Sequence, residues 1–165
     1  MNNRVQGGNR IYVAFALSII VAFTLKLVQV PYWLVSFWPD WIALVMVVWA
    51  LQAPQKVTPL IAFIVGTMLE VLTAKSFGVV SIGLATLVFL VNLSHLQLRV
   101  LSSWQQVFLV VVLVAFSNLI NLWLEGLVGG NKISVEDWYS IVGNIVVWPF
   151  INILLNEVRR AFRIR

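Results

Sequence analysis

The 165-residue chain is 61% hydrophobic and only 10% charged, with a mean hydropathy of +0.97, which is the composition of one compact membrane domain. The absence of cysteine excludes disulfides, thiolate nucleophiles and thiolate metal sites, and the single histidine, His95, cannot hold a metal ion alone. The formal charge of +5 would suggest nucleic acid for a soluble protein, but here the basic residues lie almost entirely between apolar runs.

Six apolar runs predict six membrane-spanning helices, because about 20 apolar residues cross the ~30 Å hydrocarbon core. In chain order they cover residues 11–30, 39–53, 57–74, 77–98, 104–128 and 138–156. The second run is short, about 22 Å long at the helical rise. Pro39 suits its first turn, and Asp40 suits the positive end of its dipole. In the sixth run, Pro149 predicts a kink unless neighbouring groups satisfy the freed carbonyl.

The fold class expected is therefore an all-α integral membrane protein, a compact bundle of six transmembrane helices. Residues 1–10 form a cytoplasmic tail, residues 11–157 the transmembrane domain, and residues 158–165 a basic cytoplasmic tail. This division follows from the charges. With a cytoplasmic N-terminus the inner segments carry eight basic residues and the outer loops only two, Lys75 and Lys132. The eight are Arg4, Arg10, Lys56, Arg99, Arg159, Arg160, Arg163 and Arg165. Both termini are thus predicted to be cytoplasmic.

Two ionisable residues fall inside predicted spans, where charges are costly. Glu70 lies outward of the centre of the third run by about 7 Å at the helical rise. Lys26 lies at nearly the same depth on the first run. One hypothesis is an ion pair between Lys26 and Glu70, which would reduce the burial cost of both charges. The alternative is that Lys26 extends to the outer headgroups while Glu70 is protonated or meets water.

Further polar residues share a face of the fifth run. Asn118, Asn121 and Glu125 are spaced i, i+3 and i+7, and Asn144 lies at similar depth on the sixth run. With Glu70 they are candidates for an outward-facing polar pocket. We favour the alternative that they bond neighbouring helices, at about 0.6–2 kcal/mol each. On the third run Gly66, four residues after Ala62 and four before Glu70, predicts close packing against another helix.

No motif supports catalysis, so we expect no enzyme. The chain lacks a serine–histidine–acid set, paired carboxylates at a plausible separation, a phosphate-binding glycine loop and a metal-ligand cluster. No cofactor, metal or nucleic acid is expected. The basic C-terminal tail suits contact with anionic lipid or, alternatively, with a cytoplasmic protein.

Three segments together resemble a known family. The sequence Trp38-Pro39-Asp40-Trp41 opens a short aromatic-rich span, and Gly66-Thr67-Met68-Leu69-Glu70-Val71-Leu72-Thr73 is followed closely by Phe77-Gly78. Trp148-Pro149 then precedes the basic end. This order resembles the bacterial rod-shape-determining MreD family over nearly the whole chain. In that family aspartate usually stands at the position of Glu70, so this chain keeps the charge on a longer side chain.

The resemblance implies a non-enzymatic scaffold subunit of the cell-elongation machinery in the bacterial inner membrane, required for rod shape and for organising lateral peptidoglycan synthesis. It implies association with an MreC-like bitopic protein and, through it, with an MreB-like actin homologue and peptidoglycan synthases, in a homo- or hetero-oligomer. It also implies a fold similar to the substrate-binding components of vitamin transporters. Candidate structural or partner-interface residues are Pro39, Asp40, Gly66, Glu70, Gly78 and Pro149. The alternative function is a small solute-binding or transport subunit that uses the polar pocket.

Overall fold

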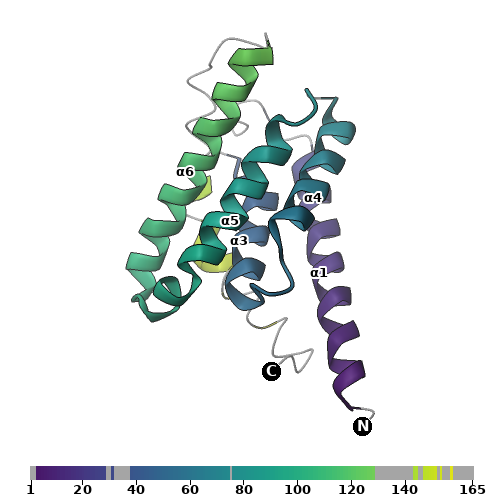
Figure 1. The fold of residues 1–165 in the computed structure, drawn as a ribbon, viewed down its shortest axis with the longest axis vertical. Helices are drawn as coiled ribbons and strands as arrows, with labels where there is room; N and C mark the ends of the chain where they lie inside the picture. The colour runs from purple at the N-terminus through teal and green to yellow at the C-terminus, as the bar shows by residue number, and fades with distance from the viewer. Residues whose placement is uncertain are drawn as a thin grey trace.

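The computed structural model describes residues 3–28, 31, 38–74, 76–128, 143, 144, 147–151, 153 and 157, without the side chains of residues 3–11, 98, 99 and 103. The five helices with described bounds are α1 (Asn3–Leu27), α3 (Trp41–Gln52), α4 (Pro59–Thr73), α5 (Val79–Val100) and α6 (Ser103–Val128) (Figure 1). The described residues beyond position 142 are helical as well. The described part of the chain is therefore built from helices and the short segments that join them.

The apolar runs locate four of these helices well. The ends of α3, α4, α5 and α6 lie within two residues of the predicted ends. Helix α1 begins at Asn3, so residues 3–10 of the predicted tail continue the helix of the first run, and their cytoplasmic location stays a prediction. Extending an existing helix needs no new nucleus, so polar residues can continue the turns that the apolar run begins. Most of the sixth run lies outside the described residues.

Local signals set the ends of α4 and α5. Thr58 caps α4 by accepting a hydrogen bond from the backbone N–H of Ile61 at 3.4 Å, and Pro59 occupies the first turn. Ala74 ends α4 in the left-handed conformation, with φ of 50°. Gly78 begins α5 with φ of +92°, which a residue with a Cβ rarely adopts. These conformations reverse the chain within a few residues, so α4 and α5 lie side by side.

Helix α3 lies at the centre of the bundle. Its residues 42–51 are all buried, and it has no polar face, as expected for a helix surrounded by others. Helices α1 and α5 pack against it, while α4 and α6 pack against α5 (Figure 1). On α1, Phe15 meets Trp49 of α3 with perpendicular rings whose centroids are 5.8 Å apart. The short second run is thus a core helix of the bundle.

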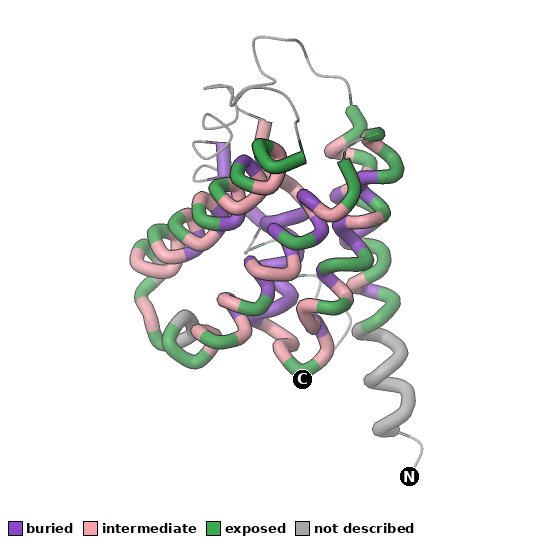
Figure 2. Tube along the Cα trace, turned by 45° about the horizontal axis from the view of Figure 1, so that its top comes forward, coloured by how far each residue is buried: buried purple, intermediate pink, exposed green. Residues whose placement is uncertain are grey.

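The outside of the molecule is apolar, and polar side chains lie within it. Large side chains such as Trp104, Phe108 and Trp123 of α6 are more than two-thirds exposed, and exposed positions follow the outer faces of several helices (Figure 2). Among the residues with described side chains, the buried polar ones are Glu70, Ser81, Ser117 and Asn144. Among the described helices, Val79–Gln97 and Trp104–Val128 are long and apolar enough to cross a membrane. Soluble proteins rarely expose so much apolar surface, so this distribution favours a lipid environment.

Candidate functional site

The carboxylate of Glu70 is bound by the N-terminus of the next helix. Glu70 is 1% exposed. Its Oε2 accepts hydrogen bonds from the Gly78 backbone N–H at 2.9 Å and the Ser81 hydroxyl at 2.7 Å. Its Oε1 accepts one from the Ser81 backbone N–H at 2.9 Å. We call Glu70, Gly78 and Ser81 the Glu70 cluster.

The electrostatics of the Glu70 cluster are those of a helix cap supplied by a neighbouring helix. The first N–H groups of α5 have no intrahelical partner, and the helix dipole places partial positive charge there. A carboxylate from α4 meets both needs, so its charge is balanced by dipoles instead of by a cation. The cluster thereby joins the C-terminal end of α4 to the start of α5.

One turn before Glu70, the two helices approach each other closely at Gly66. A Cβ added to Gly66 would lie 2.5 Å from the Cα of Ser81 and 3.0 Å from its backbone nitrogen. The neighbouring hydroxyls of Thr67 and Ser81 are 3.0 Å apart and share a hydrogen bond. The close packing predicted for Gly66 is therefore directed at α5, and it brings Ser81 within reach of Glu70.

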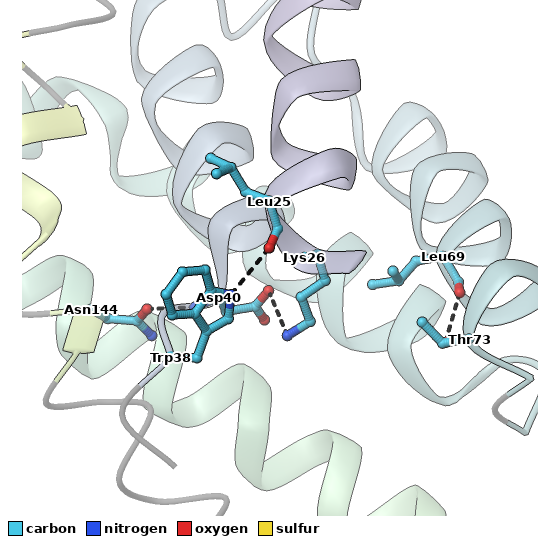
Figure 3. A network of polar contacts seen from close by, with 7 residues as sticks. All are labelled: Leu25, Lys26, Trp38, Asp40, Leu69, Thr73 and Asn144. Atoms are coloured by element: carbon cyan, nitrogen blue, oxygen red, sulfur yellow. Dashed lines mark hydrogen bonds and ion pairs between the residues drawn. The ribbon is translucent and has the colours of Figure 1, made fainter. Parts of the chain in front are cut away.

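The hypothesis of a Lys26–Glu70 ion pair is wrong for this structure. The ammonium of Lys26 lies 3.7 Å from Oδ1 of Asp40, at the start of α3, as Figure 3 shows. The side chains of Lys26 and Asp40 are 33% and 22% exposed, respectively. The Glu70 carboxylate is bonded to α5, while α3, with Asp40 just before its first residue, packs beside α1. The packing of α3 beside α1 therefore makes Asp40 the partner of Lys26.

Asp40 also connects α3 to the last described part of the chain. Its backbone N–H donates to Oδ1 of Asn144 at 2.8 Å, across 104 residues of sequence. The Asp40 side chain makes no capping hydrogen bond to α3, which begins at Trp41, two residues after the predicted start at Pro39. The indole N–H of Trp38 donates to the Leu25 carbonyl at 3.2 Å (Figure 3). These contacts hold the beginning of α3 against the end of α1 and against Asn144.

A third polar contact joins α5 to α6. The hydroxyl of Ser117 donates to the Gly83 carbonyl at 2.9 Å, and a Cβ at Gly83 would overlap the amide of Asn121. Asn121 thus lies against Gly83 of α5, whereas Asn144 lies against Asp40 at the start of α3. The half-buried side chains of Asn118 and Glu125 make no hydrogen bond to another described residue. The hydrogen bond of Asn144 fits the preferred alternative of bonds to neighbouring helices, whereas Oδ1 of Asn121 is buried without a hydrogen-bond partner among the described residues. Both the interhelical bonds of the whole set and a shared pocket stay predictions.

Three residues important to these contacts were missed by sequence reasoning. Ser81, Gly83 and Ser117 are small residues in apolar runs, and nothing in the periodicity separates them from other small residues there. A signal existed for Ser81, which is the third residue after the helix-starting Gly78. Pro149 lies in the helical stretch 147–151, beside the buried Trp148. Whether it kinks the last helix depends on residues outside the described set.

In the described part of the chain, no three residues among His, Cys, Asp and Glu come together as a metal site. The Glu70 cluster and the Ser117–Gly83 hydrogen bond can position helices and join them to one another.

The comparisons with known proteins agree with this description. A family model described as rod shape-determining protein MreD matches residues 9–158. The rod shape-determining protein MreD of Haemophilus influenzae is 28% identical over 148 residues, which cover 88% of this chain and 90% of that protein. No solved structure matches, so the likeness to vitamin-transporter components stays a prediction, and solute transport gains no support. The match over nearly the whole chain shows that it belongs to the MreD family of rod shape-determining proteins.

Proposed function

We propose that this protein is a non-enzymatic scaffold subunit of the cell-elongation machinery in the bacterial inner membrane, required for rod shape and for organising lateral peptidoglycan synthesis. The observation that carries the proposal is the family match over residues 9–158. The exposed apolar side chains and the buried polar ones support it, because apolar helix surfaces suit contact with lipid and with other transmembrane segments.

The proposed mechanism is physical. Helices of fixed relative position offer defined surfaces to an MreC-like bitopic protein, and through it to an MreB-like actin homologue and the peptidoglycan synthases. The Glu70 cluster supports this view, since a buried carboxylate that accepts hydrogen bonds through both oxygens favours one arrangement of α4 and α5. We assign Asp40, Gly66, Glu70 and Gly78 to this shaping role, and we keep Pro39 and Pro149 as candidates.

We also propose that both termini are cytoplasmic, on the basis of the distribution of basic residues. The end of α1, with Lys26, then faces outward together with Asp40 and the Glu70 cluster. Reporter fusions at each terminus test this orientation. Activity of a cytoplasm-specific reporter at both ends is expected, and reporters on opposite sides of the membrane would contradict the predicted topology.

The decisive experiment is depletion of the protein in its own rod-shaped cells. We expect the cells to become round and the MreC-like protein to lose its localisation, and we expect the wild-type gene to restore both. The matched pair Glu70→Gln and Glu125→Gln separates the Glu70 cluster from general loss of acidic charge, with only Glu125→Gln expected to restore rods fully. Cells that stay rod-shaped, with the MreC-like protein localised, would refute the proposal.

A further inference from the structure

An open groove runs between α1 and α4. Helix α1 packs against α3 and α4 packs against α5, so the facing sides of α1 and α4 leave a space of about 770 Å³ between them. Ile20, Phe23 and Leu27 line it from α1, and Ile64, Met68 and Leu72 from α4. We call this space the α1–α4 groove. Most of its lining side chains are exposed in the structure.

The chemistry of the α1–α4 groove favours hydrocarbon. Among the described residues that line it, Thr24 and Thr67 alone have polar side chains. The Thr24 hydroxyl donates to the Val21 carbonyl at 2.7 Å, and the Thr67 hydroxyl lies 3.0 Å from both the Phe63 carbonyl and the Ser81 hydroxyl. Since the single proton of each hydroxyl is already donated within the protein, these two side chains offer no free donor and only oxygen lone pairs as acceptors. A polar solute would lose most of its hydrogen bonds to water there.

The length of the groove fits one leaflet of a bilayer. Its lining residues extend over positions 19–27 of α1 and 63–72 of α4, which is about 12–14 Å along each helix at 1.5 Å per residue. One leaflet supplies about half of the ~30 Å hydrocarbon core. A membrane-spanning partner helix needs a continuous groove about twice as long. The dimensions therefore favour an acyl chain.

A positive charge lies at the end of the groove where a lipid headgroup would be. Lys26 directly precedes Leu27, the last groove residue of α1, and its side chain remains one-third exposed. Its ammonium is 3.7 Å from Asp40 Oδ1, longer than a hydrogen bond. An ammonium has three N–H donors, so Lys26 can also donate to a phosphate.

We propose that the α1–α4 groove binds an acyl chain of an anionic phospholipid from the leaflet on the Lys26 side, with the phosphate of that lipid bound by Lys26. The proposal rests on the membrane location in the proposed function. A bound lipid would fill the space between α1 and α4 and stabilise their relative position.

The test uses the purified full chain, taken from vesicles that contain equal amounts of phosphatidylglycerol and phosphatidylcholine, with retained lipid measured by native mass spectrometry. Met68→Trp fills the groove, and Leu93→Trp makes the same change at an exposed position of α5 outside it. We expect Met68→Trp to retain several-fold less phosphatidylglycerol than wild type or Leu93→Trp. Lys26→Gln should abolish the preference for phosphatidylglycerol over phosphatidylcholine.

Three results would overturn the proposal: equal retention by the two tryptophan variants, equal retention of both lipids by wild type, or loss of a copurifying membrane protein instead of lipid in Met68→Trp. Thermal unfolding of each variant shows whether it is folded. If Met68→Trp unfolds, Ile64→Phe replaces it as a smaller filling change. Failure of the proposed function appears separately, as persistent rods on depletion, and leaves lipid retention unchanged.

Discussion

Replacing Gly66 with alanine tests the close approach of α4 and α5. The added Cβ would lie 2.5 Å from the Cα of Ser81, whereas carbon atoms in contact prefer about 3.5–4.0 Å. Because the contacted atom is backbone, no rotamer change relieves the overlap, and the helices must separate by about 1 Å to restore that spacing. The same movement lengthens the three hydrogen bonds of the Glu70 cluster, which now measure 2.7–2.9 Å.

The expected magnitude follows from three terms. Overpacking of this kind costs about 1–3 kcal/mol. Weakening the Glu70 cluster costs about 1 kcal/mol for each hydrogen bond lost. Alanine stabilises a helix by about 1 kcal/mol relative to glycine, because its helix propensity is higher. We therefore expect Gly66→Ala to lower the free energy of unfolding by about 2–4 kcal/mol, which corresponds to a Tm lower by about 5–15 °C for a chain of this size.

The assay is thermal unfolding of the purified protein in a mild detergent, with Gly126→Ala as the matched control. A Cβ at Gly126 of α6 would meet no atom within 4 Å, so this control should unfold at the wild-type Tm or up to about 4 °C higher through its helix propensity. The two glycine-to-alanine changes should thus have opposite effects. A Gly66→Ala protein as stable as the control would refute the close approach.

Other contacts lead to further predictions. Glu70→Gln should lower the free energy of unfolding by about 1–3 kcal/mol, measured by thermal unfolding. The NH₂ group of the introduced glutamine would face N–H or O–H donors and could not accept their hydrogen bonds. Gly83→Ala should destabilise the wild-type chain but be tolerated with Asn121→Ala, with a coupling of about 0.5–3 kcal/mol in a double-mutant cycle. Lys26→Glu should impair stability by about 1 kcal/mol or less, since the pair is partly exposed, and Asp40→Lys in the same chain should recover part of that loss.

Each of these predictions has its own control. Glu125→Gln makes the same chemical change as Glu70→Gln at a half-buried position, and an equal loss in both variants would speak against the Glu70 cluster. Additive effects at Gly83 and Asn121 would mean that the two residues are not in contact. If Glu70→Lys restored the stability of the Lys26→Glu protein and Asp40→Lys did not, the result would support a Lys26–Glu70 ion pair instead of the Lys26–Asp40 pair.

The apolar runs predict the helices well because a backbone in an apolar environment must satisfy its own hydrogen bonds, and only a helix does so within one segment. That rule depends on composition along the chain and on little else. It fails at residues 3–10, where a polar segment continues the helix. The family resemblance was also available from sequence, since it rests on the order of short motifs such as Trp38–Trp41 and Gly66–Thr73.

The partners of the polar side chains were much harder to predict. Glu70 binds backbone N–H groups of α5, and every residue except proline has such a group, so no residue type reveals them. Ser81 becomes a partner only because Gly66 lets two helix backbones meet. Likewise, the contact of Gly83 with Asn121 depends on how far α5 and α6 turn about their own axes.

Composition and hydropathy thus establish a helical chain suited to lipid, the places of most helices, and the depth of each polar residue along them. Depth follows from counting residues, because every residue adds the same rise to a helix. Which residue faces which depends on the rotation and pairing of helices, set by the packing of all of them together. That is why Lys26 meets Asp40 instead of Glu70, although counting residues along the predicted spans places Lys26 and Glu70 at nearly the same depth.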